Sequence, residues 1–242
     1  MLSFVVPAFN EELELPASLA AIRVAAETAE QSFEIIVVDD ASTDTTAEIA
    51  RRAGARVLPV SYRHIAAVRN AGAREAGGDI LFFVDADTRI RAAHVTGALA
   101  ALKAGYAGGG ARLKAEGPIP LWGRIFIRIF CTIYFALNLG AGAFLFTTRQ
   151  NFFAIGGFDE QFFVGEEIYF TRALKKLGRF KLLREPIVTS GRKLRLYSGR
   201  VVLARSLSIM LRGPRAARSR ERLDLWYDGK RERVGNRIEI AE

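Results

Sequence analysis

The sequence predicts an α/β fold in which a mostly parallel central sheet is flanked by helices. Apolar runs of strand length alternate with longer amphipathic patterns through residues 1–90, and such alternation favours a parallel sheet. Acidic or amide side chains follow three of these apolar runs. The 242 residues, half of them hydrophobic, are enough for one large domain and too few for two of ordinary size.

The first half of the chain carries the regular alternation. Strands are expected over short runs rich in apolar residues, at residues 2–6, 33–38, 56–60 and 79–84. Helices are expected between them, from residue 10 to about 29, from 42 to about 53, and over 65–76. Helical crossovers place successive strands parallel and put helices on both faces of the sheet.

The second half is less regular. Helices are expected at residues 92–104, 121–137 and 166–177, and strands at 143–148 and 179–190. Three glycines at residues 108–110 indicate an extended segment over 106–114 with close backbone approach. An aromatic and glycine-rich loop is expected at 152–163 and an amphipathic segment at 198–212, after which the chain is charged and irregular.

One apolar stretch, residues 125–146, is long enough to span a membrane. Arg128, Asn138 and two glycines interrupt it, and a central arginine costs roughly 2.5–3.5 kcal/mol on insertion scales. We therefore expect a helix, a turn and a strand here. The N-terminus has no basic region and no cleavage signature, so it resembles a first strand rather than a signal peptide.

The net charge of +9 is concentrated at the C-terminal end. Residues 192–242 hold 14 Lys+Arg against 6 Asp+Glu, so this segment alone carries +8. A basic tail fits nucleic acid, an anionic membrane surface or a solvated face. Its few aromatics and the lack of a recognised motif argue against nucleic acid. A single cysteine, Cys131, excludes an internal disulfide and a cysteine metal cluster, and fits a reducing compartment.

Three polar clusters follow predicted strands, at the sheet edge where open α/β folds bind ligands. Their members are Pro7, Asn10 and Glu12; Asp39 and Asp40; and Asp85 and Asp87. Carboxylates at i and i+2 of an extended chain point the same way, and they repel unless a cation lies between them. Asp85 and Asp87 are therefore a candidate site for Mg²⁺ or Mn²⁺. The alternative is a solvated turn, or Asp87 as the N-cap of a helix starting near Ala92.

These motifs, in this order and spacing, resemble the inverting, nucleotide-sugar-dependent family 2 glycosyltransferases with the GT-A fold. The resemblance rests on Val-Val-Pro-Ala-Phe-Asn-Glu-Glu at 5–12, Ile-Ile-Val-Val-Asp-Asp-Ala-Ser-Thr-Asp-Thr-Thr at 35–46, Arg-Asn-Ala-Gly at 69–72, Gly-Asp at 78–79, Asp-Ala-Asp at 85–87, Gly-Gly-Phe-Asp-Glu at 156–160 and Gly-Glu-Glu at 165–167. It implies one Rossmann-like GT-A domain at 1–192, with a nucleotide-binding half (1–90) and an acceptor half (91–192). A basic helical extension at 193–242 would follow.

The resemblance implies a nucleoside-diphosphate sugar as donor. The residues expected to hold it are Pro7, Ala8, Asn10, Glu12, Asp39, Asp40, Arg69, Asp85 and Ala86. Asp40 can accept from the imide N–H of a uracil or guanine ring, and Arg69 can donate to the diphosphate. Asp87, with Asp85 nearby, is expected to hold the Mn²⁺ or Mg²⁺ that bridges the phosphates. The alternatives are turn chemistry for Asp39 and Asp40, and a surface helix charge for Arg69.

Displacement at the anomeric carbon needs a general base for the acceptor hydroxyl. The family's usual pair is Glu-Asp with the aspartate as base, but this sequence has Glu166-Glu167. Alignment gives the role to Glu167, whose extra methylene shifts its reach by about an ångström, so Glu166 stays a candidate. The family often has an acid at the position of Tyr169, and this too is missing. The alternative is that both glutamates only stabilise a helix N-terminus.

On the acceptor side, Gly157 and Phe158 are expected to contribute from the aromatic loop. Arg192 and Lys193 follow the last strand, where family members often place basic residues close to the diphosphate or acceptor. For these two residues the alternative is simply the start of the basic tail.

The leading interpretation is an inverting, metal-dependent, cytoplasmic glycosyltransferase without a nucleic-acid partner. Its acceptor stays open between a glycan, a lipid and a small molecule. A second interpretation, suggested by the Glu-Glu pair and the basic tail, is a catalytically silent sugar-nucleotide-binding or membrane-associated scaffold. A third is transfer to a lipid carrier, with residues 121–137 and 198–212 lying on the anionic inner face of the membrane. A nucleotidyltransferase would share the sheet and metal site, but residues 7–10 lack its Gly-rich loop.

Overall fold

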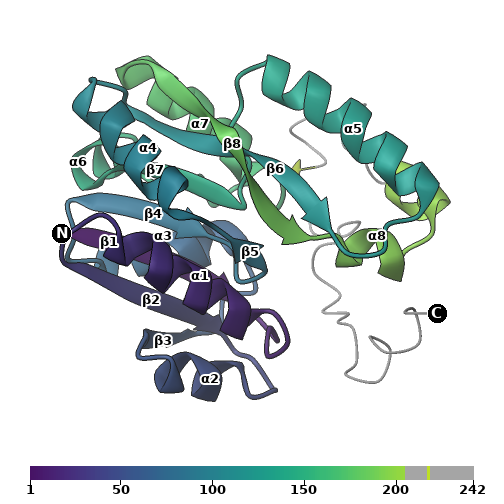
Figure 1. Ribbon diagram of the computed structural model, residues 1–242, viewed down its shortest axis with the longest axis horizontal. Helices are drawn as coiled ribbons and strands as arrows, with labels where there is room; N and C mark the ends of the chain where they lie inside the picture. The colour runs from purple at the N-terminus through teal and green to yellow at the C-terminus, as the bar shows by residue number, and fades with distance from the viewer. Residues whose placement is uncertain (205–216, 219–242) are drawn as a thin grey trace.

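The computed structural model describes residues 1–204 and 217–218. Within these ranges the strands form one sheet with the order β3-β2-β1-β4-β7-β6-β8-β5 (Figure 1). The strands are β1 (Leu2–Ala8), β2 (Phe33–Asp40), β3 (Arg56–Val60), β4 (Ile80–Val84), β5 (Thr88–Arg89), β6 (Gly108–Glu116), β7 (Phe144–Thr148) and β8 (Phe180–Ser190). The helices are α1 (Leu15–Glu27), α2 (Thr46–Arg52), α3 (Ile65–Glu75), α4 (Ala92–Lys103), α5 (Leu121–Ala136), α6 (Arg149–Ala154), α7 (Glu166–Leu177) and α8 (Arg192–Leu196).

Strands β1 to β4 form the parallel half of the sheet that the sequence predicts. β1 lies between β2 and β4 and pairs in parallel with both, and β3 extends the sheet beyond β2. Every residue of β1 is buried, as expected for a strand covered by helices on both faces. The carboxyl ends of β1, β2 and β4 therefore lie at one edge of the sheet.

The other half of the sheet is mixed. β7 pairs antiparallel with both β4 and β6, and β6 then pairs in parallel with β8. A two-residue strand that the sequence did not predict, β5, follows Asp87 and pairs antiparallel with β8. The pairing of β6 with β8 needs close backbone approach, since a Cβ at Gly109 would lie 2.3 Å from the carbonyl oxygen of Lys181. The predicted role of the glycine run is thus confirmed.

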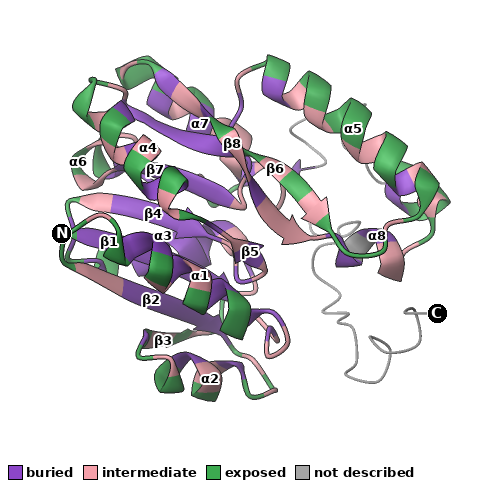
Figure 2. Ribbon diagram, in the orientation of Figure 1, coloured by how far each residue is buried: buried purple, intermediate pink, exposed green. Residues whose placement is uncertain are grey.

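Helices cover both faces of the sheet, as predicted (Figure 2). Neighbouring residues of a strand point to opposite faces, and two clusters of buried side chains result. Phe4 and Phe82 belong to the cluster packed under α1, α2 and α4. Val5 and Phe83 belong to the cluster packed under α3, α6 and α7. The observed architecture is an α/β domain with a Rossmann-like parallel half.

Some local predictions differ from the structure. The loop expected from residue 152 begins only after α6, which ends at Ala154; Thr148 starts this helix by accepting a hydrogen bond at Oγ1 from the Asn151 backbone N–H, at 3.1 Å. Residues 199–204 are helical. The remainder of the amphipathic segment at 198–212, and most of the predicted extension at 193–242, lie outside the described residues.

Helix α5 stands beside the end of the sheet rather than over it (Figure 1). It is 16 residues long, and none of the helices in the described part of the chain is long and apolar enough to cross a bilayer. Trp122, Phe126 and Ile127 pack against Leu194 of α8 and against Val202. The expected order of helix, turn and strand is found where the apolar stretch at 125–146 lies.

Candidate active site

A cavity of about 370 Å³ opens at the carboxyl ends of β1, β2 and β4. Its wall also includes the start of α3, one side of α5 and the segment leading into α7. The residues predicted from the sequence that line it are Pro7, Ala8, Asp40, Arg69, Asp85, Ala86, Asp87, Glu166, Glu167 and Arg192. The fold thus brings acids from both halves of the domain around one space.

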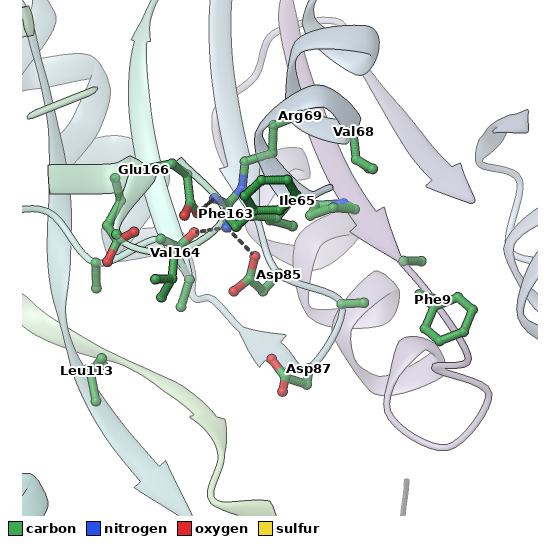
Figure 3. Close-up of a pocket in the computed structure, with 18 of the residues that line it drawn as sticks. Phe9, Ile65, Val68, Arg69, Asp85, Asp87, Leu113, Phe163, Val164 and Glu166 are labelled. Atoms are coloured by element: carbon green, nitrogen blue, oxygen red, sulfur yellow. Dashed lines mark hydrogen bonds and ion pairs between the residues drawn. The ribbon is translucent and has the colours of Figure 1, made fainter. Parts of the chain in front are cut away.

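Arg69 joins the two halves of this site. Its guanidinium lies between Asp85 and Glu166 (Figure 3). Nη2 donates to Asp85 Oδ1 at 2.8 Å and to the Gly142 carbonyl at 3.0 Å, and Nη1 donates to Glu166 Oε1. Burial opposes the charged form, but the facing carboxylates of Asp85 and Glu166 raise the pKa of Arg69 overall.

The structure therefore corrects the reading of Arg69 as a surface helix charge. The side chain is only 2% exposed, and both terminal nitrogens are used within the protein. These contacts orient two acids of the site, and a direct contact with a diphosphate would have to compete with them. Arg69 is thus placed to position Asp85 and Glu166.

Asp85 and Asp87 follow β4 and face the cavity (Figure 3). Burial raises the pKa of the Asp85 carboxyl; Arg69 counteracts this, and the neighbouring Asp87 raises it further. Asp87 accepts from Thr189 Oγ1 at 3.3 Å. The part of the chain that the structure describes holds no cluster of three or more Asp, Glu, His or Cys side chains placed for a metal.

Two aspartates are nevertheless a suitable partial ligand set. Mg²⁺ and similar ions at nucleotide sites commonly take one or two carboxylates and complete their coordination with substrate phosphates and water. The mutual repulsion of Asp85 and Asp87 is what a bound cation would relieve. The donor chemistry of the pair therefore fits Mn²⁺ or Mg²⁺.

Arg192 approaches the same place from the end of β8. Its guanidinium donates through both terminal nitrogens to the carboxylate of Glu11, and both side chains are buried. One of its nitrogens also lies 3.4 Å from Asp87 Oδ2. Arg192 is thus part of the site rather than the start of a solvated tail. Lys193 lies in α8, and its side chain is outside the description.

Glu166 and Glu167 begin α7 after Gly165, which has a left-handed backbone. Glu166 is buried against Arg69. Glu167 Oε1 accepts from the hydroxyl of Tyr134, at 3.3 Å. Burial and the adjacent charge of Glu166 raise the pKa of Glu167 to about 8. The positive end of the helix dipole stabilises two acids in the first turn of α7. This effect does not explain why both side chains line a cavity.

Several predicted residues stand outside the cavity wall. Asn10 Oδ1 accepts from the Thr43 backbone N–H at 2.8 Å, and Glu12 Oε2 accepts from the Thr45 hydroxyl at 2.8 Å. Asp39 Oδ1 accepts from the Ser42 backbone N–H at 3.3 Å. These contacts tie the loop after β1 to the turn after β2, and the predicted contacts of Asn10, Glu12 and Asp39 with a nucleoside stay predictions.

Gly157 and Phe158 also lie behind the wall. Phe158 is 1% exposed and stacks on Phe170 with ring centroids 4.1 Å apart. A Cβ at Gly157 would lie 2.7 Å from Asn70 Oδ1, and this residue has φ of +77°, so the turn requires glycine. The structure gives the pair a packing role, and contact with an acceptor stays a prediction.

The cavity residues that were missed from the sequence include the polar side chains of Glu11, His64 and Tyr134. Glu11 is one of two adjacent acids, and only the fold decides which of them turns inward. Tyr134 lies within an apolar helix, where an aromatic residue is ordinarily read as packing. His64 precedes α3 and caps it, with Nδ1 accepting from the Ala67 backbone N–H at 3.5 Å; a lone histidine carries no sequence signal for a site.

Comparison with known proteins agrees with this geometry. A family model described as glycosyl transferase family 2 matches residues 3–180. An undecaprenyl-phosphate 4-deoxy-4-formamido-L-arabinose transferase from Aeromonas hydrophila is 36% identical over 95 residues, covering 36% of this chain and 29% of that protein. A 4,4'-diaponeurosporenoate glycosyltransferase from Staphylococcus haemolyticus is 38% identical over 107 residues, covering 40% of this chain and 27% of that protein. The matches thus span less than a third of either relative.

Solved structures share the fold over most of the chain. The mannosyltransferase PcManGT from Pyrobaculum calidifontis, solved with GDP-Man and Mn²⁺, has a TM-score of 0.61 and 19% identity, covering 87% of this chain and 64% of that one. Glucosyl-3-phosphoglycerate synthase from Mycobacterium tuberculosis, solved with Mn²⁺, UDP and phosphoglyceric acid, has a TM-score of 0.60 and 18% identity. The match covers 91% of this chain and 80% of that one. At such identities the likeness is one of fold.

Proposed function

The chain belongs to glycosyl transferase family 2 and is a transferase with a GT-A fold, and from this premise we propose that it moves a sugar from a nucleoside-diphosphate sugar to an acceptor hydroxyl with inversion. The observation that supports this most is the meeting of two acidic pairs at one cavity. Asp85 and Asp87 suit a divalent cation beside a diphosphate. Glu166 and Glu167 suit a base beside an acceptor.

In the proposed step the acceptor oxygen bonds to the anomeric carbon as the bond from that carbon to the diphosphate oxygen breaks on the opposite side. The acceptor proton passes to Glu167, and the electron pair of the broken bond leaves with the nucleoside diphosphate. Glu167 suits the role better than Glu166, because Glu166 is already paired with Arg69. The pKa of Glu167, raised to about 8, makes its carboxylate a stronger base than an ordinary glutamate.

The leaving-group side of the cavity belongs to Asp85, Asp87 and Arg192. The two aspartates would hold Mn²⁺ or Mg²⁺, which would offset the negative charge growing on the departing diphosphate. Arg192, 3.4 Å from Asp87, is close enough to share the same phosphates as a charge-assisted donor. Arg69 acts as a positioning residue beneath them, since its guanidinium is buried against Asp85 and Glu166.

A more specific candidate is transfer to an acceptor carried by a lipid at the inner face of the membrane. Several relatives have undecaprenyl phosphate in their names. Helix α5 supports the idea, because the helix and the residue that follows it expose apolar side chains at four-residue spacing. Each of these side chains is more than half exposed: Leu121, Ile125, Ile129, Ile133 and Leu137. Arg124 and Arg128 are exposed on the same helix. Such a helix lies in a membrane interface, and each basic residue near an anionic surface adds about 1 kcal/mol.

The position of α5 suits this acceptor. Phe130, Cys131, Tyr134 and Phe135 of the helix line the cavity, while its apolar row faces outward. An acceptor headgroup at the lipid surface would therefore enter beside Tyr134 and meet Glu167. The enzyme would then act from the cytoplasm as a peripheral protein, with the basic segment at 192–242 adding attraction to anionic lipid.

The competing proposal is a catalytically silent sugar-nucleotide-binding scaffold. To separate the two, the protein is incubated with UDP-, GDP-, CDP- and dTDP-sugars, Mn²⁺ and a lipid or glycan acceptor extract, and free nucleoside diphosphate is measured. Transfer predicts release from a preferred donor, loss of release in Asp87→Ala, and a product whose anomeric proton coupling shows inversion. Binding without release from every donor supports the scaffold instead.

A further inference from the structure

Asn70 belongs to the Arg-Asn-Ala-Gly motif at 69–72, and the proposed chemistry gives it no role. It lies in α3 and is only 6% exposed. A polar side chain inside a helix commonly turns to solvent or bonds its own backbone. The Asn70 side chain does neither, because it contacts the loop before α7, 88 residues further along the chain.

The amide of Asn70 binds both polar groups of one backbone residue. Nδ2 donates to the Phe158 carbonyl at 2.8 Å, and Oδ1 accepts from the Phe158 backbone N–H at 2.9 Å. Nδ2 also donates to Oε1 of Glu160, at 2.8 Å. An asparagine amide offers two N–H donors and one carbonyl oxygen, so each of its polar groups is used on this loop.

Both sides of this contact are shaped by glycine. A Cβ at Gly157 would lie 2.7 Å from Asn70 Oδ1, and a Cβ at Gly72 would lie 2.4 Å from Cγ1 of Val5. The first glycine lets the loop approach the amide, and the second lets α3 pack closely on β1. Asn70 therefore joins the loop to a helix that is itself packed tightly on the central sheet.

Phe158 connects the loop to α7. Its ring stacks on Phe170 with centroids 4.1 Å apart and planes 11° from parallel, and both residues are 1% exposed. Phe170 comes three residues after Glu167, which is less than one helical turn. A displacement of Phe158 would therefore displace the turn of α7 that carries Glu167.

The residue before Asn70 contacts the same region. Arg69 donates through Nη1 to Glu166 at the start of α7 (Figure 3), and its guanidinium carbon lies 5.3 Å from the centroid of the Phe158 ring. Two consecutive residues of α3 thus hold the start of α7, Arg69 by a direct ion pair and Asn70 through Phe158. Near-attack geometry is sensitive to displacements of about an ångström.

We propose that Asn70 is a positioning residue for Glu167, and that by binding the Phe158 backbone it fixes where this carboxylate lies relative to the acceptor. The proposal rests on the proposed function, in which Glu167 takes the acceptor proton. Asn70 is not among the residues that line the cavity, so it acts through Phe158 and Phe170 and touches no substrate. Its loss should lower kcat and leave donor binding intact.

The first test measures sugar transfer in Asn70→Ala and in Asn151→Ala. Asn151 is a matched control, because its Nδ2 also donates to a backbone carbonyl, that of Ala107 at 2.9 Å, away from the residues lining the cavity. The thermal midpoint should fall in both variants. Only Asn70→Ala should lower kcat, by about tenfold to hundredfold, with little change in KM for the donor. Asn70→Ser is the milder substitute if Asn70→Ala does not fold.

A second test exchanges donors for acceptors without changing shape. Asn70→Asp faces the Phe158 carbonyl and the Glu160 carboxylate with oxygens that cannot donate, so both donated bonds become repulsive contacts and kcat should fall. Glu160→Gln in that background supplies an N–H to the new carboxylate and should restore kcat severalfold. In the wild type, Glu160→Gln has no such repulsion to relieve. Equal effects of Glu160→Gln in the two backgrounds would overturn the proposed role of Asn70.

A third measurement follows Glu167 without needing sugar transfer. The ¹³C resonance of its carboxyl, assigned by its loss in Glu167→Gln, is titrated with pH. Burial and Glu166 raise the pKa of Glu167 to about 8, while Arg69 and Tyr134 oppose the rise. If Asn70→Ala moves the carboxyl out of these surroundings, its titration midpoint should fall toward that of an ordinary glutamate.

The outcomes separate this proposal from the transferase reaction. A Glu167 midpoint that is the same in the wild type and in Asn70→Ala, or equal losses of kcat in Asn70→Ala and Asn151→Ala, would overturn the positioning role. A shifted midpoint in a protein that transfers no sugar from any donor would support the positioning role and overturn the proposed function. Full transfer by Asn70→Ala would do the reverse.

Discussion

The hydroxyl of Tyr134 lies 3.3 Å from Oε1 of Glu167 and 2.8 Å from the carbonyl oxygen of Gly140. Tyr134 belongs to α5 and Glu167 to the first turn of α7. The contact therefore joins the helix with the exposed apolar row to the proposed base. Burial and Glu166 raise the pKa of Glu167, and the hydrogen bond from Tyr134 opposes that rise.

Replacing Tyr134 by phenylalanine should impair catalysis more than binding. Tyr134→Phe removes the hydrogen bond to the Glu167 carboxylate, so we expect kcat to fall about threefold to thirtyfold at neutral pH with little change in KM for the donor. The pKa of Glu167 should rise further, which moves the pH–rate profile to higher pH. Tyr106→Phe is the matched control, since Tyr106 lies away from the cavity against Arg179. A profile unchanged in Tyr134→Phe would argue against the positioning role.

Arg69 should matter for stability as well as for activity. Arg69→Met leaves Asp85 and Glu166 without their shared cation, and breaking a buried ion pair costs about 3–5 kcal/mol. The measurement is the free energy of unfolding in urea. Arg74→Ala on the same helix removes an exposed pair with Glu160 and should cost less than about 1 kcal/mol. Similar losses in the two variants would show that Arg69 does not hold the acids together.

Asp87 should govern cation binding. Asp87→Asn removes one of two charged ligands, so Mn²⁺ affinity in the presence of UDP or GDP should drop roughly tenfold or more, as followed by electron paramagnetic resonance. Asp79→Asn is the control, because the Asp79 side chain is 89% exposed and pairs with the N-terminus. Undiminished Mn²⁺ binding in Asp87→Asn would place the cation elsewhere.

The exposed row of α5 should mediate contact with anionic lipid. Ile129→Glu combined with Ile133→Glu should reduce co-sedimentation with phosphatidylglycerol vesicles severalfold, because both charge and lost apolar burial oppose insertion. Val24→Glu on α1 is the matched control, since Val24 is 64% exposed and α1 lies far from α5 (Figure 1). Co-sedimentation that is indifferent to the α5 substitutions, or to salt and anionic lipid, would contradict a membrane-docking role.

The parallel half of the fold could be predicted because each strand is a short apolar run bounded by a helical pattern. Strand β5 could not, since two residues carry no periodicity and exist only through pairing with β8. The carboxylate clusters could be placed because parallel strands align their carboxyl ends at one edge. Asp40, Asp85 and Asp87 accordingly line the cavity.

The inward or outward direction of loop side chains could not be predicted. Asn10 has a left-handed backbone with φ of 51°, and of the two acids after it Glu11 is buried against Arg192 while Glu12 bonds Thr45. Tyr134 and His64 were missed for a related reason. Their roles depend on which elements pack beside them. A single tyrosine in an apolar helix, or a single histidine before a helix, does not indicate from the sequence which elements those are.

The most direct test of the account is the pH dependence of kcat/KM for sugar transfer in the wild type and in Glu167→Gln. Only the carboxylate form of Glu167 can take the acceptor proton, so activity should rise with pH through about 8, the raised pKa of this group. Glu167→Gln should bind the donor with unchanged affinity, lose at least a hundredfold in rate, in the range typical of general bases, and show no such rise. Full turnover in Glu167→Gln would contradict the base role and indicate an acceptor that brings its own negative charge, such as a lipid phosphate.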